Sequence, residues 1–158
     1  MAGDDIPGTS ETSNHFRTSA QMTPFHLAFP TTDLAATRSY LEGVLGFAVG
    51  RTAARWVDFD IAGHQVTAHL VDSAADLPTN PVDGRAVPAF HFGLVMDWDD
   101  WQALADRLEQ AGTDFRIEPT IRFREQPGEQ GTFFINIPGG AVMEFKTFRD
   151  MAKLFATQ

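Results

Sequence analysis

The sequence predicts an α+β fold made from two copies of a βαβββ unit. The same order of strand-type and helix-type patterns occurs twice along the 158 residues. The two halves also share short sequence motifs. Phe-His-Leu-Ala at 25–28 is similar to Phe-His-Phe-Gly at 90–93, and Ile-Ala-Gly-His at 61–64 is similar to Ile-Pro-Gly-Gly at 137–140. Duplication of one supersecondary unit is the simplest explanation of both repeats.

The first unit begins after Pro24 with an alternating strand. Asp33 is placed to cap a helix that contains Tyr40 and Leu41 and ends near the glycines at 43 and 46. Strands follow wherever apolar and polar residues alternate, and turn residues separate them. The predicted strands of this unit are 25–29, 47–50, 56–61 and 64–71.

The second unit repeats this order from residue 89 onward. Its helix follows Asp97–Asp100 and carries Trp101, Leu104, Ala105, Leu108 and Ala111 at spacings of three and four, which is typical of one buried face. Gly112 is expected to end that helix. The predicted strands are 89–96, 115–117 with an extension past Pro119, 132–137 and 141–146.

The remaining segments define the domain organisation. Residues 1–22 are rich in Ser, Thr, Gly and Asp, and we expect a flexible N-terminal arm there. Residues 23–148 form one domain with modules at 23–72 and 88–148, joined by a Pro-containing linker. Residues 149–158 form a C-terminal tail, for which a short amphipathic helix using Met151, Leu154 and Phe155 is one interpretation.

Composition narrows the function. The chain has no cysteine, which excludes disulfides, a thiol nucleophile and cysteine-liganded zinc. Twelve basic against twenty-one acidic residues give a net charge of −9, which argues against nucleic acid or an anionic membrane surface as a partner. There is no apolar run of membrane-spanning length and no secretory signal pattern, so a cytoplasmic location is expected.

Strand alternation predicts that several polar side chains share one concave face. His26 and His91 sit at repeat-equivalent positions, each opposite in parity to the flanking Phe and Leu residues. Glu144 lies in the last strand, where an ionised carboxylate is costly unless it is paired or bound to metal. Two imidazoles and a carboxylate suit a divalent ion. His69 follows the same parity as Gln65 and Thr67 and is either a fourth ligand or an acid–base group.

These patterns resemble the vicinal oxygen chelate superfamily, which includes glyoxalase I, extradiol dioxygenases, fosfomycin-resistance transferases and bleomycin-binding proteins. The resemblance covers residues 24–148 and is carried by the stretches 25–27, 40–47, 58–65, 91–93 and 138–146. It implies that the paired βαβββ modules form an open, cup-like mixed β-sheet barrel. That barrel would surround one metal ion, which chelates adjacent oxygens of a substrate.

The resemblance also implies site residues. His26, His91 and Glu144 match the metal ligands, with Fe²⁺ or Mn²⁺ favoured and Zn²⁺ or Ni²⁺ as alternatives. His69 falls where glyoxalase I enzymes place a glutamate, which weakens a glyoxalase interpretation and leaves His69 as the candidate base. Extradiol enzymes also use a second-sphere tyrosine, but the only tyrosine here, Tyr40, is expected to pack on the first helix.

The residues leave three functions open. The favoured one is a metal-dependent, dioxygenase-like enzyme acting on a small molecule with adjacent oxygens. The alternatives are a glyoxalase-like lyase or isomerase and a non-catalytic drug-resistance binding protein. The stretch 118–131 is expected to be either a binding loop, with Arg122 or Arg124 holding a substrate carboxylate, or a solvated loop or extension of an edge strand. A homodimer is a further expectation.

Overall fold

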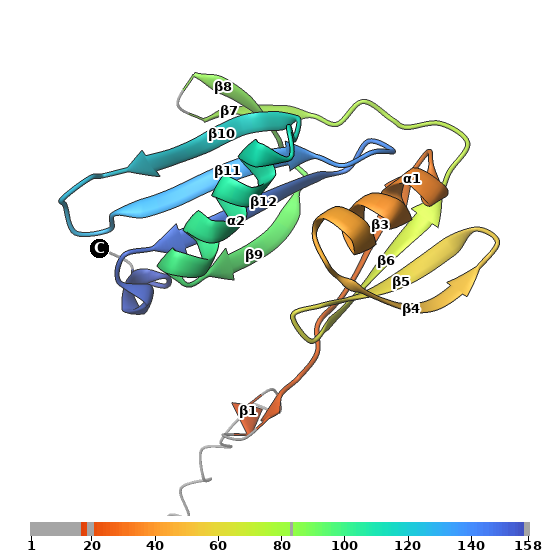
Figure 1. Ribbon diagram of the computed structural model, residues 1–158, viewed down its shortest axis with the longest axis horizontal. Helices are drawn as coiled ribbons and strands as arrows, with labels where there is room; N and C mark the ends of the chain where they lie inside the picture. Colours follow the sequence, from red (N-terminus) through yellow and green to blue (C-terminus); the bar gives the residue numbers. More distant parts are fainter. Residues whose placement is uncertain (1–16, 19–20, 83, 157–158) are drawn as a thin grey trace, which may run out of the picture.

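The fold consists of two open four-stranded mixed sheets, each accompanied by a helix (Figure 1). The computed structural model describes residues 17–18, 21–82 and 84–156. The first sheet has the order β3-β6-β5-β4 and the second has the order β10-β11-β12-β9. The strands of the first sheet are β3 (His26–Thr31), β4 (Ala48–Ala53), β5 (Trp56–Ile61) and β6 (His64–Leu70). Those of the second are β9 (Phe92–Met96), β10 (Phe115–Arg122), β11 (Gln130–Asn136) and β12 (Val142–Phe148).

The two sheets have the same internal topology, which confirms the predicted duplication. In each sheet the first strand of the module lies parallel to the last, while the other pairs are antiparallel. Ala28 pairs with Thr67 in the first sheet, and Gly93 pairs with Glu144 in the second. His26 lies two residues before Ala28, and His91 lies two residues before Gly93, so the two histidines hold equivalent places in the two modules.

Each module has one helix between its first two strands. α1 (Leu34–Ser39) starts at Asp33, whose side chain accepts a hydrogen bond from the Ala36 N–H at 2.9 Å, and it continues into the π-helical turn η1 (Tyr40–Val44). α2 (Trp98–Gln110) buries four of the five predicted apolar residues, whereas the fifth, Ala111, follows the end of the helix and is exposed. Tyr40 packs against the core, as predicted.

One hydrophobic core serves both modules. It contains residues of both sheets and both helices, and the rings of Phe29 and Phe92 meet across the module boundary with centroids 4.9 Å apart. The apolar sides of β3 and β9 consequently face this shared core. Strand alternation then turns the opposite, polar sides of these strands away from it.

A second junction joins the modules through hydroxyl groups. The Thr37 hydroxyl lies 2.7 Å from the carbonyl oxygen of Pro138 and 2.7 Å from the Thr31 hydroxyl, and both threonines are buried. The Thr32 N–H donates to the Gly139 carbonyl at 3.0 Å. A Cβ on Gly139 would lie only 1.9 Å from the Thr31 hydroxyl, so this approach needs glycine.

The segment between the modules is more ordered than a linker. It folds into an antiparallel hairpin of β7 (Thr79–Val82) and β8 (Arg85–Pro88), which Figure 1 shows beside β10. Proline has no backbone N–H to donate, and a two-stranded ribbon leaves half of its backbone groups unpaired, so Pro81 and Pro88 are tolerated in this hairpin. Val87 is buried and belongs to a small apolar cluster with Ile117, Phe134 and Val142.

The structure decides two other expectations. Half of the stretch 118–131 is strand, because β10 extends to Arg122 and β11 begins at Gln130, while residues 123–129 form the connection between them. The edge-strand interpretation is therefore correct for residues 118–122. The C-terminal tail forms only a short 3-10 turn, η2 (Met151–Lys153), and Phe155 is 86% exposed. The amphipathic helix is therefore wrong, since its apolar residues have no face to cover.

The N-terminal arm lies mostly outside the described residues. Its described part forms a small pair of strands, β1 (Arg17–Thr18) and β2 (Gln21–Met22). Within the described part of the chain, no helix combines the length and the apolar character that crossing a bilayer requires.

Candidate functional site

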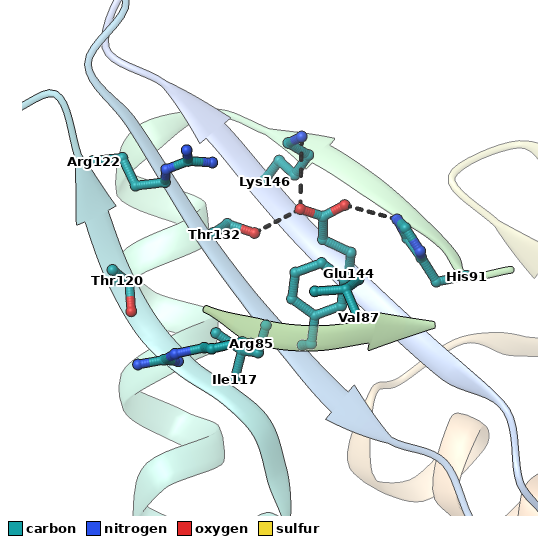
Figure 2. A pocket seen from close by; sticks show the side chains of 10 residues that line it. Arg85, Val87, His91, Ile117, Thr120, Arg122, Thr132, Glu144 and Lys146 are labelled. Atoms are coloured by element: carbon teal, nitrogen blue, oxygen red, sulfur yellow. Dashed lines mark hydrogen bonds and ion pairs between the residues drawn. The ribbon is translucent and has the colours of Figure 1, made fainter. Parts of the chain in front are cut away.

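A cavity of about 340 Å³ opens on the polar face of the second sheet (Figure 2). β10, β11 and β12 form its floor, and β8 passes over one side of it. Apolar and charged side chains share the lining, which consists of Arg85, Val87, His91, Ile117, Thr120, Arg122, Thr132, Phe134, Glu144 and Lys146.

His91 and Glu144 meet in this cavity. His91 Nε2 lies 3.2 Å from Glu144 Oε2, and both side chains are largely shielded from solvent. His91 Nδ1 is 2.8 Å from the Pro88 carbonyl oxygen. A carbonyl only accepts, so Nδ1 carries a proton, and Nε2 either donates a second proton to the carboxylate or directs its lone pair at it.

This arrangement fits a divalent cation. Two acceptor atoms 3.2 Å apart repel each other unless a cation or a proton lies between them. Ligands about 2.1 Å from a common ion in tetrahedral or octahedral geometry lie roughly 3.0–3.4 Å from one another. The Pro88 carbonyl is the kind of outer partner that fixes the tautomer of a metal-binding histidine.

The other oxygen of Glu144 is held in place. Glu144 Oε1 accepts a hydrogen bond from the Thr132 hydroxyl at 2.7 Å, and Lys146 Nζ is 3.6 Å away. Figure 2 shows these two contacts on one side of the carboxylate and His91 on the other. The carboxylate is thus oriented with one oxygen anchored and the other directed at His91.

His26 lies apart from this pair. It begins β3 in the first sheet, is exposed, and is not one of the described residues that line the cavity. Among the described residues, no three His, Asp or Glu side chains converge in a way that could hold a metal ion. A single chain therefore brings together two of the three predicted ligands and leaves the third on the other sheet.

His69 is also on the first sheet. Alternation places it on the same face as Gln65 and Thr67, as predicted, and it is exposed. The strand register identifies the counterpart of Glu144 in the first sheet. Thr67 pairs with Ala28 in that sheet, and Glu144 pairs with Gly93 in the second. Thr67, rather than His69, thus occupies the position equivalent to Glu144 in the duplicated unit.

Asp58 is a polar residue at the centre of the first sheet that sequence reasoning missed. It is only 5% exposed and accepts hydrogen bonds from the side chains of Thr67 (2.6 Å), Gln65 (3.0 Å) and Arg51 (3.1 Å). Burial alone would raise the pKa of Asp58. The hydrogen bonds from Thr67, Arg51 and Gln65, together with the Arg51 charge, lower that pKa below its ordinary value.

The two candidate arginines separate. Arg122 ends β10 and lines the cavity, whereas Arg124 is exposed in the turn that follows and is not among the described lining residues. The pairing of β10 with β11 shifts between Ile117 and Thr120. This irregularity lets Ile117, Thr120 and Arg122 all line the cavity, although simple alternation would put Ile117 on the opposite face from the other two.

Sequence reasoning also missed the cavity residues Arg85, Thr132 and Lys146. Arg85 lies in the segment interpreted as a linker, where no periodic pattern was available to assign a face. Lys146 and Thr132 carried a usable signal, because Lys146 has the strand parity of Glu144 and faces Thr132 across the β11–β12 ladder. Alternation from Glu144 would have identified both.

Comparisons with known proteins agree with this fold. A similar solved structure is a glyoxalase/bleomycin resistance protein/dioxygenase from Alicyclobacillus acidocaldarius, with 26% identity, a TM-score of 0.68, and coverage of 84% of this chain and 96% of that one. The genomically encoded fosfomycin resistance protein of Listeria monocytogenes has 16% identity, a TM-score of 0.59, and coverage of 80% and 93%. The lactoylglutathione lyase of Agrobacterium tumefaciens has 14% identity, a TM-score of 0.56, and coverage of 81% and 95%.

The last two likenesses concern the fold alone. No curated protein matches the chain. The match to the family extends over residues 23–145, which spans both modules and the hairpin between them. The chain therefore belongs to the Glyoxalase/Bleomycin resistance protein/Dioxygenase superfamily.

Proposed function

We propose that this protein is a metal-dependent enzyme of the vicinal oxygen chelate type, with dioxygenase-like chemistry on a small molecule that carries adjacent oxygens. His91 and Glu144 supply two ligands, and His26 supplies the third. Fe²⁺ or Mn²⁺ is the favoured ion for a set of two imidazoles and one carboxylate. The observation that carries this proposal is the 3.2 Å approach of His91 Nε2 to Glu144 Oε2, with the imidazole tautomer set by Pro88.

A second copy of the chain completes the ligand set in this proposal. His26 and the His91–Glu144 pair belong to different sheets, and the polar faces of β3 and β9 are turned away from the shared core. The partner subunit's His26 therefore joins His91 and Glu144, so that the dimer carries two equivalent sites.

The protein groups have separate tasks. The bound ion would act as a Lewis acid toward two neighbouring substrate oxygens. Thr132 and Lys146 hold Glu144 in its orientation, and Arg122 binds a substrate carboxylate. The partner subunit's His69, which lies on the same sheet as His26, takes a proton from a substrate hydroxyl as the general base.

Metal analysis after anaerobic purification tests the ligands. We expect about one divalent ion per wild-type chain and a large loss of metal in His91→Ala, because that change removes one of three ligands. His64→Ala is the matched control, since His64 Nδ1 accepts a hydrogen bond from the Phe25 N–H instead of lining the cavity. Unchanged metal content in His91→Ala, or equal loss in His64→Ala, contradicts the assignment.

Mixed dimers test the shared site. His26→Ala and His91→Ala homodimers each lack one ligand in every site. A heterodimer of the two variants retains one complete site if the ligands come from different subunits, and none if they come from the same subunit. Recovery of half the wild-type metal content in the purified heterodimer supports the proposal, and no recovery refutes it.

The second candidate is a non-catalytic small-molecule binding protein. One observation favours it, because Thr132, Lys146 and a His91 protonated on both ring nitrogens satisfy Glu144 without an ion. Turnover assays with catechols and α-ketoaldehydes on the metal-loaded protein discriminate the two functions. His69→Ala should retain metal and lose turnover if His69 is the base. Loss of metal in that variant would make His69 a ligand instead.

A further inference from the structure

The cavity on the second sheet combines positive charge with an apolar wall. Among the described residues that line it, Arg85, Arg122 and Lys146 are cationic and Glu144 is the one carboxylate. This concentration of cations is unusual in a chain with twelve basic and twenty-one acidic residues. Like charges lining a partly enclosed space repel one another and focus a positive potential into it, and a bound anion offsets that repulsion.

Three different strands deliver these cations. Arg85 comes from β8, Arg122 from the end of β10 and Lys146 from β12, and Figure 2 shows Arg122 and Lys146 near the outer side of Glu144. Arg85 extends along β10 toward Thr120. The guanidinium groups offer planar pairs of donors that match carboxylate, phosphate or phosphonate oxygens.

The remaining wall of the cavity is apolar. Val87, Ile117 and Phe134 line it and form one buried cluster with Val142. Phe134 also meets the His91 ring edge-on, with centroids 5.2 Å apart. An occupant therefore meets both apolar side chains and cationic donors, in a volume of about 340 Å³, at the lower end of the range for small-molecule sites.

We propose that this cavity selects small organic oxyanions, with a carboxylate, phosphate or phosphonate group held by Arg85, Arg122 and Lys146 and an apolar body of about one ring against Val87, Ile117 and Phe134. The inference deepens the proposed function and rests on it for one point, namely that this ligand is the substrate. The cavity also contains His91 and Glu144, so an anchored anion presents its other oxygens to the proposed metal ligands.

Binding to metal-free protein tests the anion site separately from the metal site. The chelator-treated full-length chain is titrated calorimetrically with benzoate, phenyl phosphate and neutral benzamide at two salt concentrations. We expect benzoate or phenyl phosphate to bind at least about tenfold more tightly than benzamide, because charge-assisted hydrogen bonds distinguish them. The preference between the two anions identifies the headgroup, and higher salt should weaken binding of both.

Charge-neutralising variants locate the site. Arg85→Gln and Arg122→Gln should each weaken binding of the preferred anion by at least about tenfold. Arg124→Gln removes the same charge from the exposed turn outside the cavity and should change affinity less than about twofold. Thermal unfolding of each variant checks that it is folded. Arg85 lies on the hairpin rather than in a sheet, so its variant remains informative if Arg122→Gln fails to fold.

The outcomes separate this inference from the proposed function. Equal affinity for benzoate, phenyl phosphate and benzamide, no binding of any probe, or equal effects of Arg85→Gln and Arg124→Gln would overturn the anion site. Anion binding that depends on Arg85 and Arg122, in a protein that fails to bind metal, would support the anion site while refuting the proposed metal enzyme.

Discussion

Gly93→Ala is predicted to damage the second sheet at the point where the site is built. Gly93 pairs with Glu144 in the parallel β9–β12 ladder. A Cβ at residue 93 would lie 1.6 Å from the Glu144 carbonyl oxygen, well inside the 3.0 Å below which such contacts are essentially never found. The obstacle is backbone, so no side-chain rotation relieves it.

The cost follows from that overlap. β9 must separate from β12 by more than an ångström, which combines overpacking with loss of ladder hydrogen bonds, and we expect a destabilisation of about 2–4 kcal/mol. For a chain of this length the melting temperature should fall by roughly 4–16 °C. The same movement separates His91 from Glu144, so affinity for a divalent ion should fall as well.

Gly43→Ala is the matched control. A Cβ on Gly43 would meet nothing within 4 Å, and the residue lies in the helical turn η1, so alanine there should be neutral or stabilise by about 0.4–1 kcal/mol. Calorimetric melting of the wild type, Gly93→Ala and Gly43→Ala measures stability, and metal titration at a temperature where all three are folded measures affinity for a divalent ion. Equal melting temperatures for the two variants would refute the reasoning.

Two further predictions concern buried polar groups. Asp58→Ala should destabilise the protein by about 2–3 kcal/mol at neutral pH, whereas Asp72→Ala, which loses an exposed ion pair with Arg55, should cost less than about 1 kcal/mol. Because the pKa of Asp58 is lowered in the folded state, its contribution to stability is complete above the ordinary carboxyl pKa and is lost as the pH falls through the folded-state pKa. Urea unfolding from pH 7 to 2 should therefore show the stabilities of wild type and Asp58→Ala converging, and a constant difference between them would contradict this. Thr37→Val should lower the free energy of unfolding in urea by about 1–3 kcal/mol, because it removes the hydroxyl that donates to the Pro138 carbonyl. Thr147→Val is the control and should be neutral or stabilising, because the buried Thr147 hydroxyl has no hydrogen-bond partner among the described residues. Similar urea midpoints for the two variants would count against the hydroxyl junction.

Regular alternation explains which elements could be predicted. Residues 56–61 alternate without interruption, and β5 has those bounds. The helix from Trp98 was predictable because its four buried residues follow a single helical spacing. β7 and β8 were missed because prolines at 78, 81 and 88 dominate the local pattern, and proline weighs against a strand when no neighbouring strand is known.

The site was predictable where it depends on strand parity. His91 lies at a repeat-related position and Glu144 at an alternating one, and their side chains approach to 3.2 Å, while their role as metal ligands stays a prediction. The cavity around them depends on the register shift between Ile117 and Thr120 and on a hairpin from elsewhere in the chain, neither of which local periodicity encodes. His26 is separated from His91 because Phe29 and Phe92 pack together in a core common to both modules, which turns the histidine-bearing faces of the two strands away from it. This packing between modules is not encoded in the pattern of either strand alone.

The hairpin between the modules has a consequence for how this protein could diversify. It connects the two halves of the chain and also provides Arg85 and Val87 to the cavity wall. Substitutions in its exposed residues alter the charge and shape offered to a ligand while leaving the eight sheet strands and the shared core unchanged. Part of the cavity lining is thus encoded on a segment outside the two four-stranded sheets, and randomising the hairpin is an economical starting library for changing the proposed specificity.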